Sequence, residues 1–223
     1  MPSLDDLRVR SANKKKIRSP ENMSMGAKFF QSLGIDTYQL RKSSSKDEPS
    51  VVSDWSRIES KVSNCTKCIL HKGRTNTVFG DGNKDSDWFF VGEAPGKDED
   101  IQGKPFVGRA GRILTEVIFS MGLSREDVFI ANILKCRPPD NRDPKSEEVQ
   151  KCIGYLQKQI NLVNPKVIVA VGRIAAHSLL KTDLPMGKLR GKLHNFETSK
   201  GSIPTLVIYH PALYHPSPSA ECN

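Results

Sequence analysis

Four cysteines have the types and spacing of a metal or redox site. Cys65 and Cys68 form a C-x-x-C pair, and Cys136 and Cys152 follow much later in the chain. Four thiolates suit either a structural zinc ion or a 4Fe–4S cluster. Taken alone, the C-x-x-C pair is also compatible with a redox couple or with two core cysteines. The fifth cysteine, Cys222, is expected to be an exposed thiol outside this group.

A second set of candidate residues comes directly after short apolar runs. The segment Gly92-Glu93-Ala94-Pro95-Gly96 follows one run, Asn132 a second, Gly172-Arg173 a third and His210-Pro211-Ala212 a fourth. Their side chains can donate and accept protons or hydrogen bonds, and the glycines allow a close approach of backbone to a ligand. Each has an ordinary structural alternative, such as a turn asparagine or a loop-binding glutamate.

The elements that must position these residues can be read from the hydrophobic pattern. The apolar runs predict strands at 87–91, 127–131, 166–171 and 204–209, and helical spacing predicts helices at 54–62, 109–121, 146–162 and 173–180. Strands alternating with helices indicate an α/β fold of three layers, with a central, mostly parallel four-stranded sheet flanked by helices. Ligands of such folds bind beyond the carboxyl ends of the strands, so the second set of residues should gather there.

The charge of the chain favours a polyanionic partner. The 223 residues include 34 Lys or Arg and 25 Asp or Glu, a net charge of +9. Residues 1–50 carry +4 of this charge and predict a mostly disordered basic arm before a folded domain at 51–223. Within the arm, residues 29–41 predict either a docking segment for a protein partner or a terminal helix packed on its own domain.

Composition also excludes several classes of protein. No apolar run approaches the roughly 20 residues that span a bilayer, and the acidic first residues do not fit a secretory signal. We therefore expect no membrane segment and a cytoplasmic, nucleoid-associated location, where disulfides are disfavoured. A collagen-like or fully disordered chain is excluded as well.

Five separated blocks, in this order and spacing, resemble the family 4 uracil-DNA glycosylases, the iron–sulfur type, over roughly residues 60–213. The blocks are 92–96, Glu99-Asp100, 103–111, Asn132 with 135–142, and 210–212. The resemblance implies an enzyme that hydrolyses the N-glycosidic bond of a flipped-out deoxyuridine in single- or double-stranded DNA. The product would be an abasic site, the first intermediate of base-excision repair.

The resemblance also implies a role for each residue of the base pocket. Phe106 would stack on the uracil ring, and the Asn132 amide would read its Watson–Crick edge. His210 would donate to O2, where negative charge develops, and Glu93 would position or activate the attacking water. Glu99 would form a wall beside uracil C5 that excludes the thymine methyl group. Substrate-lining backbone is expected from Gly92, Ala94 and Gly96.

The same resemblance moves the metal prediction from zinc to a 4Fe–4S cluster held by the four cysteines, with structural zinc as the alternative. The cluster would be structural or DNA-orienting, because the hydrolysis needs no electron. Lys135, Arg137 and Arg142, near the cluster, would contact DNA phosphates. The enzyme is expected to act as a monomer.

The sequence departs from the family pattern at its end. The usual motif HPAxLLR is here His210-Pro211-Ala212-Leu213-Tyr214-His215-Pro216, with proline at the arginine position. Leu213 or Tyr214 would then serve as the wedge that fills the gap left by the flipped base. The departure leaves one alternative open, a catalytically weak or inactive Fe–S nucleic-acid-binding protein of the same fold. A further alternative is a metal-stabilised interaction module that acts through residues 29–41.

Overall fold

The computed structural model describes residues 54–214. The predicted basic arm, its segment 29–41 and Cys222 lie outside the described residues. Among the helices of the described part, none combines the length and apolar character that crossing a membrane requires.

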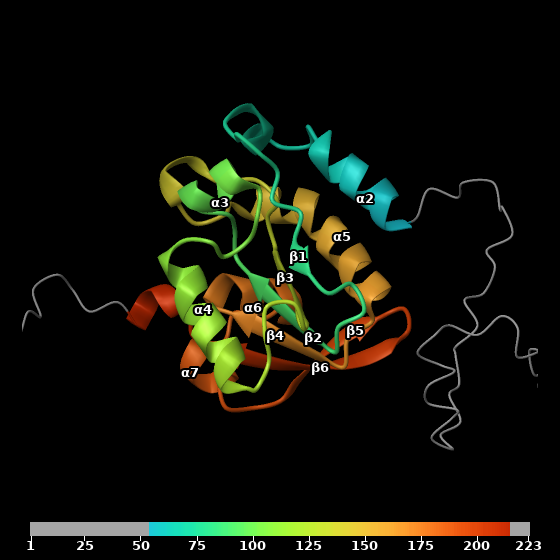
Figure 1. Ribbon diagram of the computed structural model, residues 1–223, viewed down its shortest axis with the longest axis vertical. Helices are drawn as coiled ribbons and strands as arrows, with labels where there is room; N and C mark the ends of the chain where they lie inside the picture. Colours follow the sequence, from blue (N-terminus) through green and yellow to red (C-terminus); the bar gives the residue numbers. More distant parts are fainter. Residues whose placement is uncertain (1–53, 215–223) are drawn as a thin grey trace, which may run out of the picture. The chain divides into compact units, whose positions relative to one another are not determined.

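The described chain alternates helices and strands (Figure 1). In chain order the elements are α2 (Asp54–Ser63), η2 (Ile69–Lys72), β1 (Asp81–Gly82), β2 (Trp88–Gly92), α3 (Lys97–Gln102), α4 (Arg109–Ser120), β3 (Val128–Asn132), η3 (Pro139–Asn141), α5 (Ser146–Val163), β4 (Val167–Val171), α6 (Arg173–Leu180), α7 (Met186–Leu189), β5 (His194–Thr198), β6 (Gly201–Ile208) and η4 (Pro211–Tyr214).

The sheet has the order β1-β3-β2-β4-β6-β5, and its four inner strands are parallel. These four are the strands that the sequence predicts, and the α/β class is confirmed. The strand count of four is wrong, because β1 and β5 add antiparallel edges. Neither edge strand carries an apolar run: β1 has two residues, and β5 buries only Phe196.

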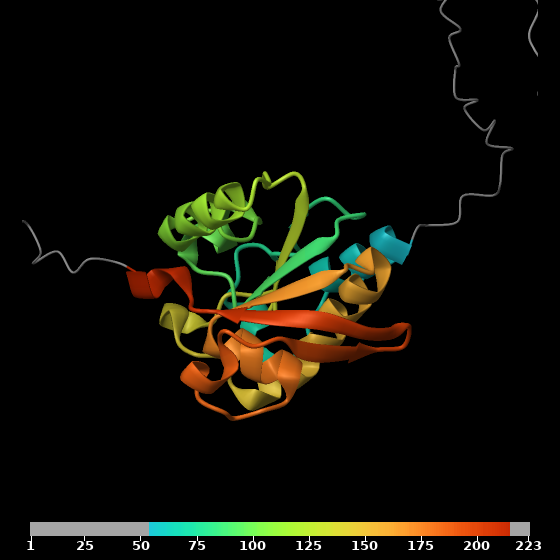
Figure 2. The same cartoon turned by 90° about the horizontal axis from the view of Figure 1, so that it is seen from below.

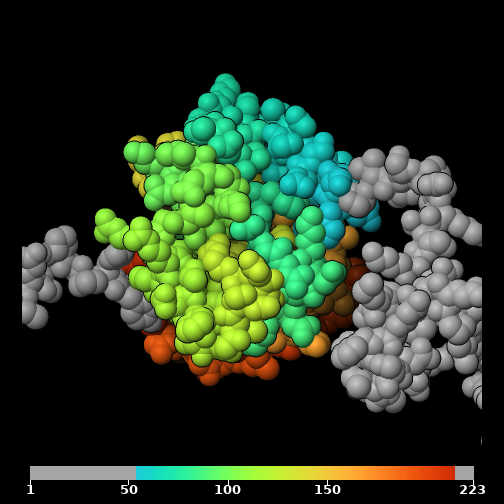
Figure 3. Space-filling model, in the orientation of Figure 1, coloured from blue at the N-terminus to red at the C-terminus, as the bar shows by residue number. Residues whose placement is uncertain are grey.

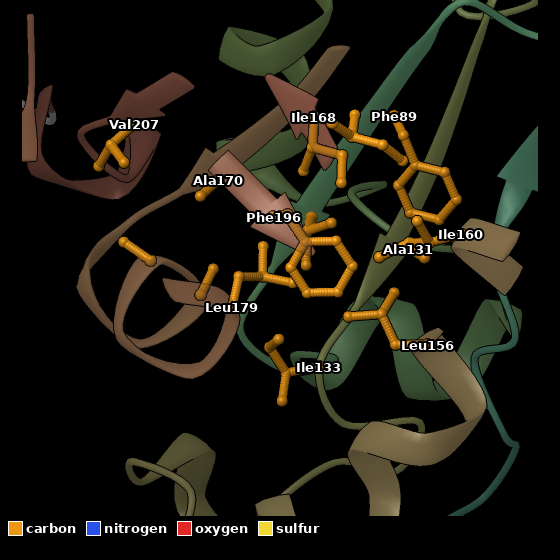
Figure 4. Close-up of a cluster of buried hydrophobic side chains, with 14 of the residues drawn as sticks. Phe89, Ala131, Ile133, Leu156, Ile160, Ile168, Ala170, Leu179, Phe196 and Val207 are labelled. Atoms are coloured by element: carbon orange, nitrogen blue, oxygen red, sulfur yellow. The ribbon is translucent and has the colours of Figure 1, made fainter. Parts of the chain in front are cut away.

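The two faces of the sheet pack against different helices, because alternate residues of each strand point to opposite sides. In β2, Phe89 and Val91 join the core formed with α5 and α6 (Figure 4). Phe90 lies in the other core, with Leu114 and Ile118 of α4. Figure 2 shows the sheet between these layers, and Figure 3 shows α4 covering the face toward the viewer. The expected three-layer arrangement therefore holds for the described residues.

The helix ends follow local signals with small differences. Helix α5 ends where Asn164 adopts a left-handed conformation (φ 50°), directly before Pro165, as the proline predicts. Helix α4 stops at Ser120, and Gly122 takes the positive φ of 76° that closes its end. Helix α2 begins at Asp54, as predicted, and ends one residue later than the predicted range, at Ser63.

Truncating a side chain of the core shared by the sheet and α5 should destabilise the whole domain. Leu156 is fully buried, so Leu156→Ala should lower the free energy of unfolding by roughly 2–5 kcal/mol. Leu193 is 65% exposed, and Leu193→Ala should change it by no more than about 0.5 kcal/mol. Urea unfolding monitored by circular dichroism measures both, and equal losses would contradict this assignment of the core.

Candidate functional site

The ends of the parallel strands bring the second set of candidate residues together, as the fold class predicts. Gly92 at the end of β2 pairs with Asn132 at the end of β3. His210 follows β6, and its Cβ would lie 3.0 Å from a Cβ built on Gly172. Gly172 follows β4 and has φ +93°, a conformation that favours glycine.

Gly92 provides a close approach between Asn132 and Phe106. A Cβ at Gly92 would lie 2.4 Å from Asn132 Oδ1 and 2.5 Å from Phe106 Cζ. The amide oxygen and the aromatic ring therefore meet at a backbone position without a side chain. Asn132 is 2% exposed, and its Oδ1 is buried without a hydrogen-bond partner. An unpaired buried acceptor is costly in a folded protein, so Oδ1 is suited to receive a donor from a ligand.

The loop that carries Phe106 is fixed from both sides. Phe106 has a left-handed backbone (φ 53°), which is strained for an aromatic residue. Glu99 Oε1 accepts hydrogen bonds from the backbone N–H groups of Val107 and Gly108 at 2.9 and 3.0 Å. On the other side, Arg125 Nη1 donates to the Phe106 carbonyl at 3.1 Å. These charged groups hold the ring in place.

Glu99 also accepts from Gly96 N at 3.1 Å, so its carboxylate binds three backbone donors of the loop. The structure thus gives it a loop-organising position, and its role as a wall beside uracil C5 stays a prediction. Gly96 is fixed by this bond.

His210 has a defined tautomer. The Ala212 N–H donates to His210 Nδ1 at 3.3 Å, and because an N–H can only donate, the proton of the neutral ring is on Nε2. Burial lowers the pKa of His210 and the Glu99 charge opposes this shift, so the neutral form dominates at neutral pH. The ring centroid of His210 lies 6.1 Å from that of Phe106. His210 can therefore offer one N–H donor near the aromatic ring.

Glu93 has a carboxyl group with a raised pKa. Burial and, to a smaller extent, the Asp143 carboxylate raise its pKa to about 7, against the opposing effect of the Arg173 guanidinium. Asp143 and Arg173 form an ion pair with 2.9 Å between Arg173 Nη2 and Asp143 Oδ2. A carboxyl group with a pKa near the working pH can act as a general base. The backbone of Glu93 is fixed to the segment that follows β3, because Leu134 N donates to the Glu93 carbonyl at 3.0 Å.

The four predicted cysteine ligands line one cavity. Cys65 and Cys68 come from the loop between α2 and η2, Cys136 from the loop after β3, and Cys152 from α5. All four are free thiols. Basic groups surround them: Arg74 Nη1 donates to Cys136 Sγ at 3.2 Å, and the cavity is also lined by Lys67 and Lys151.

The donor set fits a thiolate-ligated metal group. Burial raises the pKa of Cys136 against the effect of Arg74, and it raises the pKa of Cys152 to about 11 against that of Lys135. Buried thiols of this kind ionise only when a strong positive charge binds them. Within residues 54–214, however, no three Cys, His, Asp or Glu side chains converge closely enough to hold one metal ion.

Lys135 is a correction to the predicted DNA-contacting residues. It is 1% exposed, and its ammonium donates to the carbonyls of Phe79 and Asn132 and to Gln159 Oε1 at 3.1, 3.0 and 2.7 Å. Its backbone N–H donates to Cys152 Sγ at 3.3 Å. Burial lowers the pKa of Lys135 to about 7, while Cys152 raises it. Lys135 is an internal link between the end of β3 and the cysteine cavity, and it cannot reach a phosphate.

The other predicted DNA contacts lie nearer the surface. Arg142 binds Glu148 through two nitrogens, at 2.9 and 2.6 Å, and its side chain is 32% exposed. Arg137 Nε donates to Asn141 Oδ1 at 2.7 Å. Leu213 is 71% exposed, as a wedge requires, and Tyr214 is the last residue of η4. Their contacts with DNA stay predictions.

Sequence reasoning missed several charged residues and one glutamine that hold the site together. They are Arg74, Arg125, Asp143, Arg173 as a partner of Asp143, and Gln159. None lies in a motif, and each acts on a residue distant in sequence, so no local pattern reveals it. For Arg173, its position directly after Gly172 at a strand end was the one available signal.

Comparisons with known proteins agree with this geometry. The uracil DNA glycosylase superfamily profile matches residues 79–221. A type-4 uracil-DNA glycosylase of Archaeoglobus fulgidus is 50% identical over 161 residues, 70% of this chain and 81% of the relative. One of Thermotoga maritima is 46% identical over 156 residues, 70% of this chain and 80% of the relative. A type-5 uracil-DNA glycosylase of Pyrobaculum aerophilum is 32% identical over 130 residues, 52% of this chain and 54% of the relative. The chain belongs to the uracil-DNA glycosylase superfamily and groups with its type-4 members.

Proposed function

We propose that this protein is a uracil-DNA glycosylase that hydrolyses the N-glycosidic bond of a flipped-out deoxyuridine and leaves an abasic site. The observation that carries the proposal is the unpaired, buried Oδ1 of Asn132 beside the Phe106 ring. Uracil N3–H is a donor that would satisfy this oxygen, and the flat ring would lie on Phe106. Cytosine presents an acceptor at N3 and would leave Oδ1 unpaired, which disfavours its binding.

The proposed reaction assigns one step to His210 and one to Glu93. When the bond between C1′ and N1 breaks, its electron pair goes to the uracil ring and negative charge develops on O2. The Nε2–H of neutral His210 donates a hydrogen bond to that oxygen. The oxygen of a water molecule bonds to C1′, and the Glu93 carboxylate accepts the proton of that water. The sugar gains a hydroxyl group and uracil leaves as the anion, so atoms and charge balance.

The four cysteines are proposed to hold a 4Fe–4S cluster. The basis is the set of four thiols that line one cavity, two of them buried and two half-buried. Such a donor set suits either a zinc ion or a 4Fe–4S cluster, and the resemblance of the sequence blocks to the iron–sulfur type of glycosylase favours the cluster. The cluster would fasten the 65–68 loop, the 136 loop and α5 together and would take no part in the hydrolysis.

Base reading by Asn132 can be tested by excision from single- and double-stranded oligonucleotides. The wild-type protein should convert uracil-containing strands, but not cytosine-containing ones, to abasic sites. Asn132→Asp should lose uracil excision and gain cytosine excision, because a protonated carboxyl group donates to cytosine N3 and accepts from its amino group. Alkaline cleavage of the strands measures both. If the wild type produces no abasic sites in either single- or double-stranded DNA, the proposed activity is wrong. The alternative, an inactive nucleic-acid-binding protein, would then remain.

Glu93 as the general base predicts a pH dependence. With a pKa of about 7, Glu93 is protonated below that pH and cannot accept a proton, so kcat/KM should rise toward pH 7 and level off above it. Glu93→Gln should lower kcat roughly 10²–10⁴-fold and abolish the rise. Asp143→Asn removes a charge that raises this pKa, so it should move the rise to lower pH. An unchanged pH profile in Glu93→Gln would assign the rise to another group.

The cluster predicts the metal content of the purified protein. The wild-type protein should be brown and contain iron and acid-labile sulfide. Cys136→Ser removes one of the four cavity thiols and should lose most of the iron. Cys222→Ser, outside the predicted ligand set, is the matched control and should keep it. Elemental analysis measures both variants, and stoichiometric zinc without iron in the wild type would contradict the cluster.

A further inference from the structure

Three exposed cations occupy alternate positions in the segment 186–192. They are Lys188, Arg190 and Lys192. Within residues 54–214, none of the three forms an ion pair with a carboxylate. Their charge is therefore available to an external anion. The guanidinium groups of Arg142 and Arg173, in contrast, form ion pairs with Glu148 and Asp143 of the same chain.

The segment is anchored to the domain. Leu189, between the cations, is 1% exposed. Its carbonyl accepts a hydrogen bond from His194 Nε2 at 2.7 Å, and Arg190 N donates to the Met186 carbonyl at 2.9 Å. A fixed backbone lowers the entropy that a ligand must remove when it orders the basic side chains.

Arg190 connects this segment to the base pocket. Its guanidinium carbon lies 4.7 Å from the centroid of the Tyr209 ring. Tyr209 directly precedes His210, whose ring centroid lies 6.1 Å from that of Phe106. Figures 1 and 2 both show α7 and η4 at the same end of the domain. A guanidinium stacked by its face keeps its N–H edge for hydrogen bonds to a phosphate.

We propose that Lys188, Arg190 and Lys192 form a binding site for the phosphodiester backbone of the DNA strand that carries the flipped nucleotide. The inference rests on the proposed function, because a strand whose base occupies the pocket beside His210 must pass along the rim of that pocket. The site would act on strand binding and not on base reading, because its link to the pocket is the contact of Arg190 with the Tyr209 ring. Phosphate contacts of this kind position a strand without reading its sequence.

The triple variant Lys188→Gln/Arg190→Gln/Lys192→Gln tests the site by the salt dependence of DNA binding. The probe is a fluorescent single-stranded oligonucleotide without uracil, and the matching duplex is the second probe. Each lost phosphate contact lowers the slope of log K against log salt by about 0.7 for a single strand and about 0.9 for a duplex. The slope should therefore fall by about two to three in the triple variant.

The matched control is Lys158→Gln/Lys166→Gln/Lys200→Gln, which removes the same charge. Lys166 and Lys200 directly precede β4 and β6, so they lie at the edge of the sheet away from the pocket. The slope of this control should stay within about 0.5 of the wild type. An equal fall in both triple variants, or no fall in either, would overturn the proposed site.

Folding and function are separated by two further measurements. Lys188→Gln and Lys192→Gln change exposed side chains, and each alone should lower the slope by about 0.7 on the single strand. If the slope of either folded single variant equals that of the wild type, the proposed site is also overturned. If the wild type excises no uracil while the slope still falls in the triple variant, the DNA site stands and the proposed glycosylase activity fails. If excision is normal and the slopes do not change, the glycosylase activity stands and the proposed DNA site fails.

Discussion

The pairing of Gly92 with Asn132 at the carboxyl ends of β2 and β3 is the constraint on which the site depends. The position of Gly92 must lack a side chain, because Asn132 Oδ1 and the Phe106 ring both occupy the space that a Cβ would need. The register of the parallel strands is in turn set by the alternation of buried residues on the two faces of β2. The relative positions of Asn132 and Phe106 are thus a direct result of how the sheet core packs.

Charged side chains fix the loop around Phe106 and shift the pKa of Glu93. Glu99 and Arg125 hold the strained backbone around Phe106, one by accepting from its amides and the other by donating to a carbonyl. Asp143 and Arg173 shift the pKa of Glu93 in opposite directions. These residues touch the substrate in no proposed step, but the proposed chemistry needs the loop position and protonation states that they set.

The sequence predicts the four inner strands, the long helices and the residues at the strand ends, because apolar runs and helical spacing are local signals. It does not predict the edge strands: β5 has a single buried residue, Phe196, and β1 is too short for a pattern. The sequence also does not predict the burial of Lys135. A lysine beside a cysteine motif looks like a surface cation, and only the distant carbonyl of Phe79 and the side chain of Gln159 reveal its burial.

The segment from Asn132 to Cys136 has a further consequence for how this chain can vary. Within it lie the buried amide of Asn132, the buried ammonium of Lys135 and one of the cavity thiols. Inserting or deleting one residue there would displace either the amide or the thiol, since both ends are fixed by contacts with other elements. Length changes in evolution or in engineering are therefore excluded from this segment, even though most of it lies outside regular secondary structure, where such changes are ordinarily tolerated.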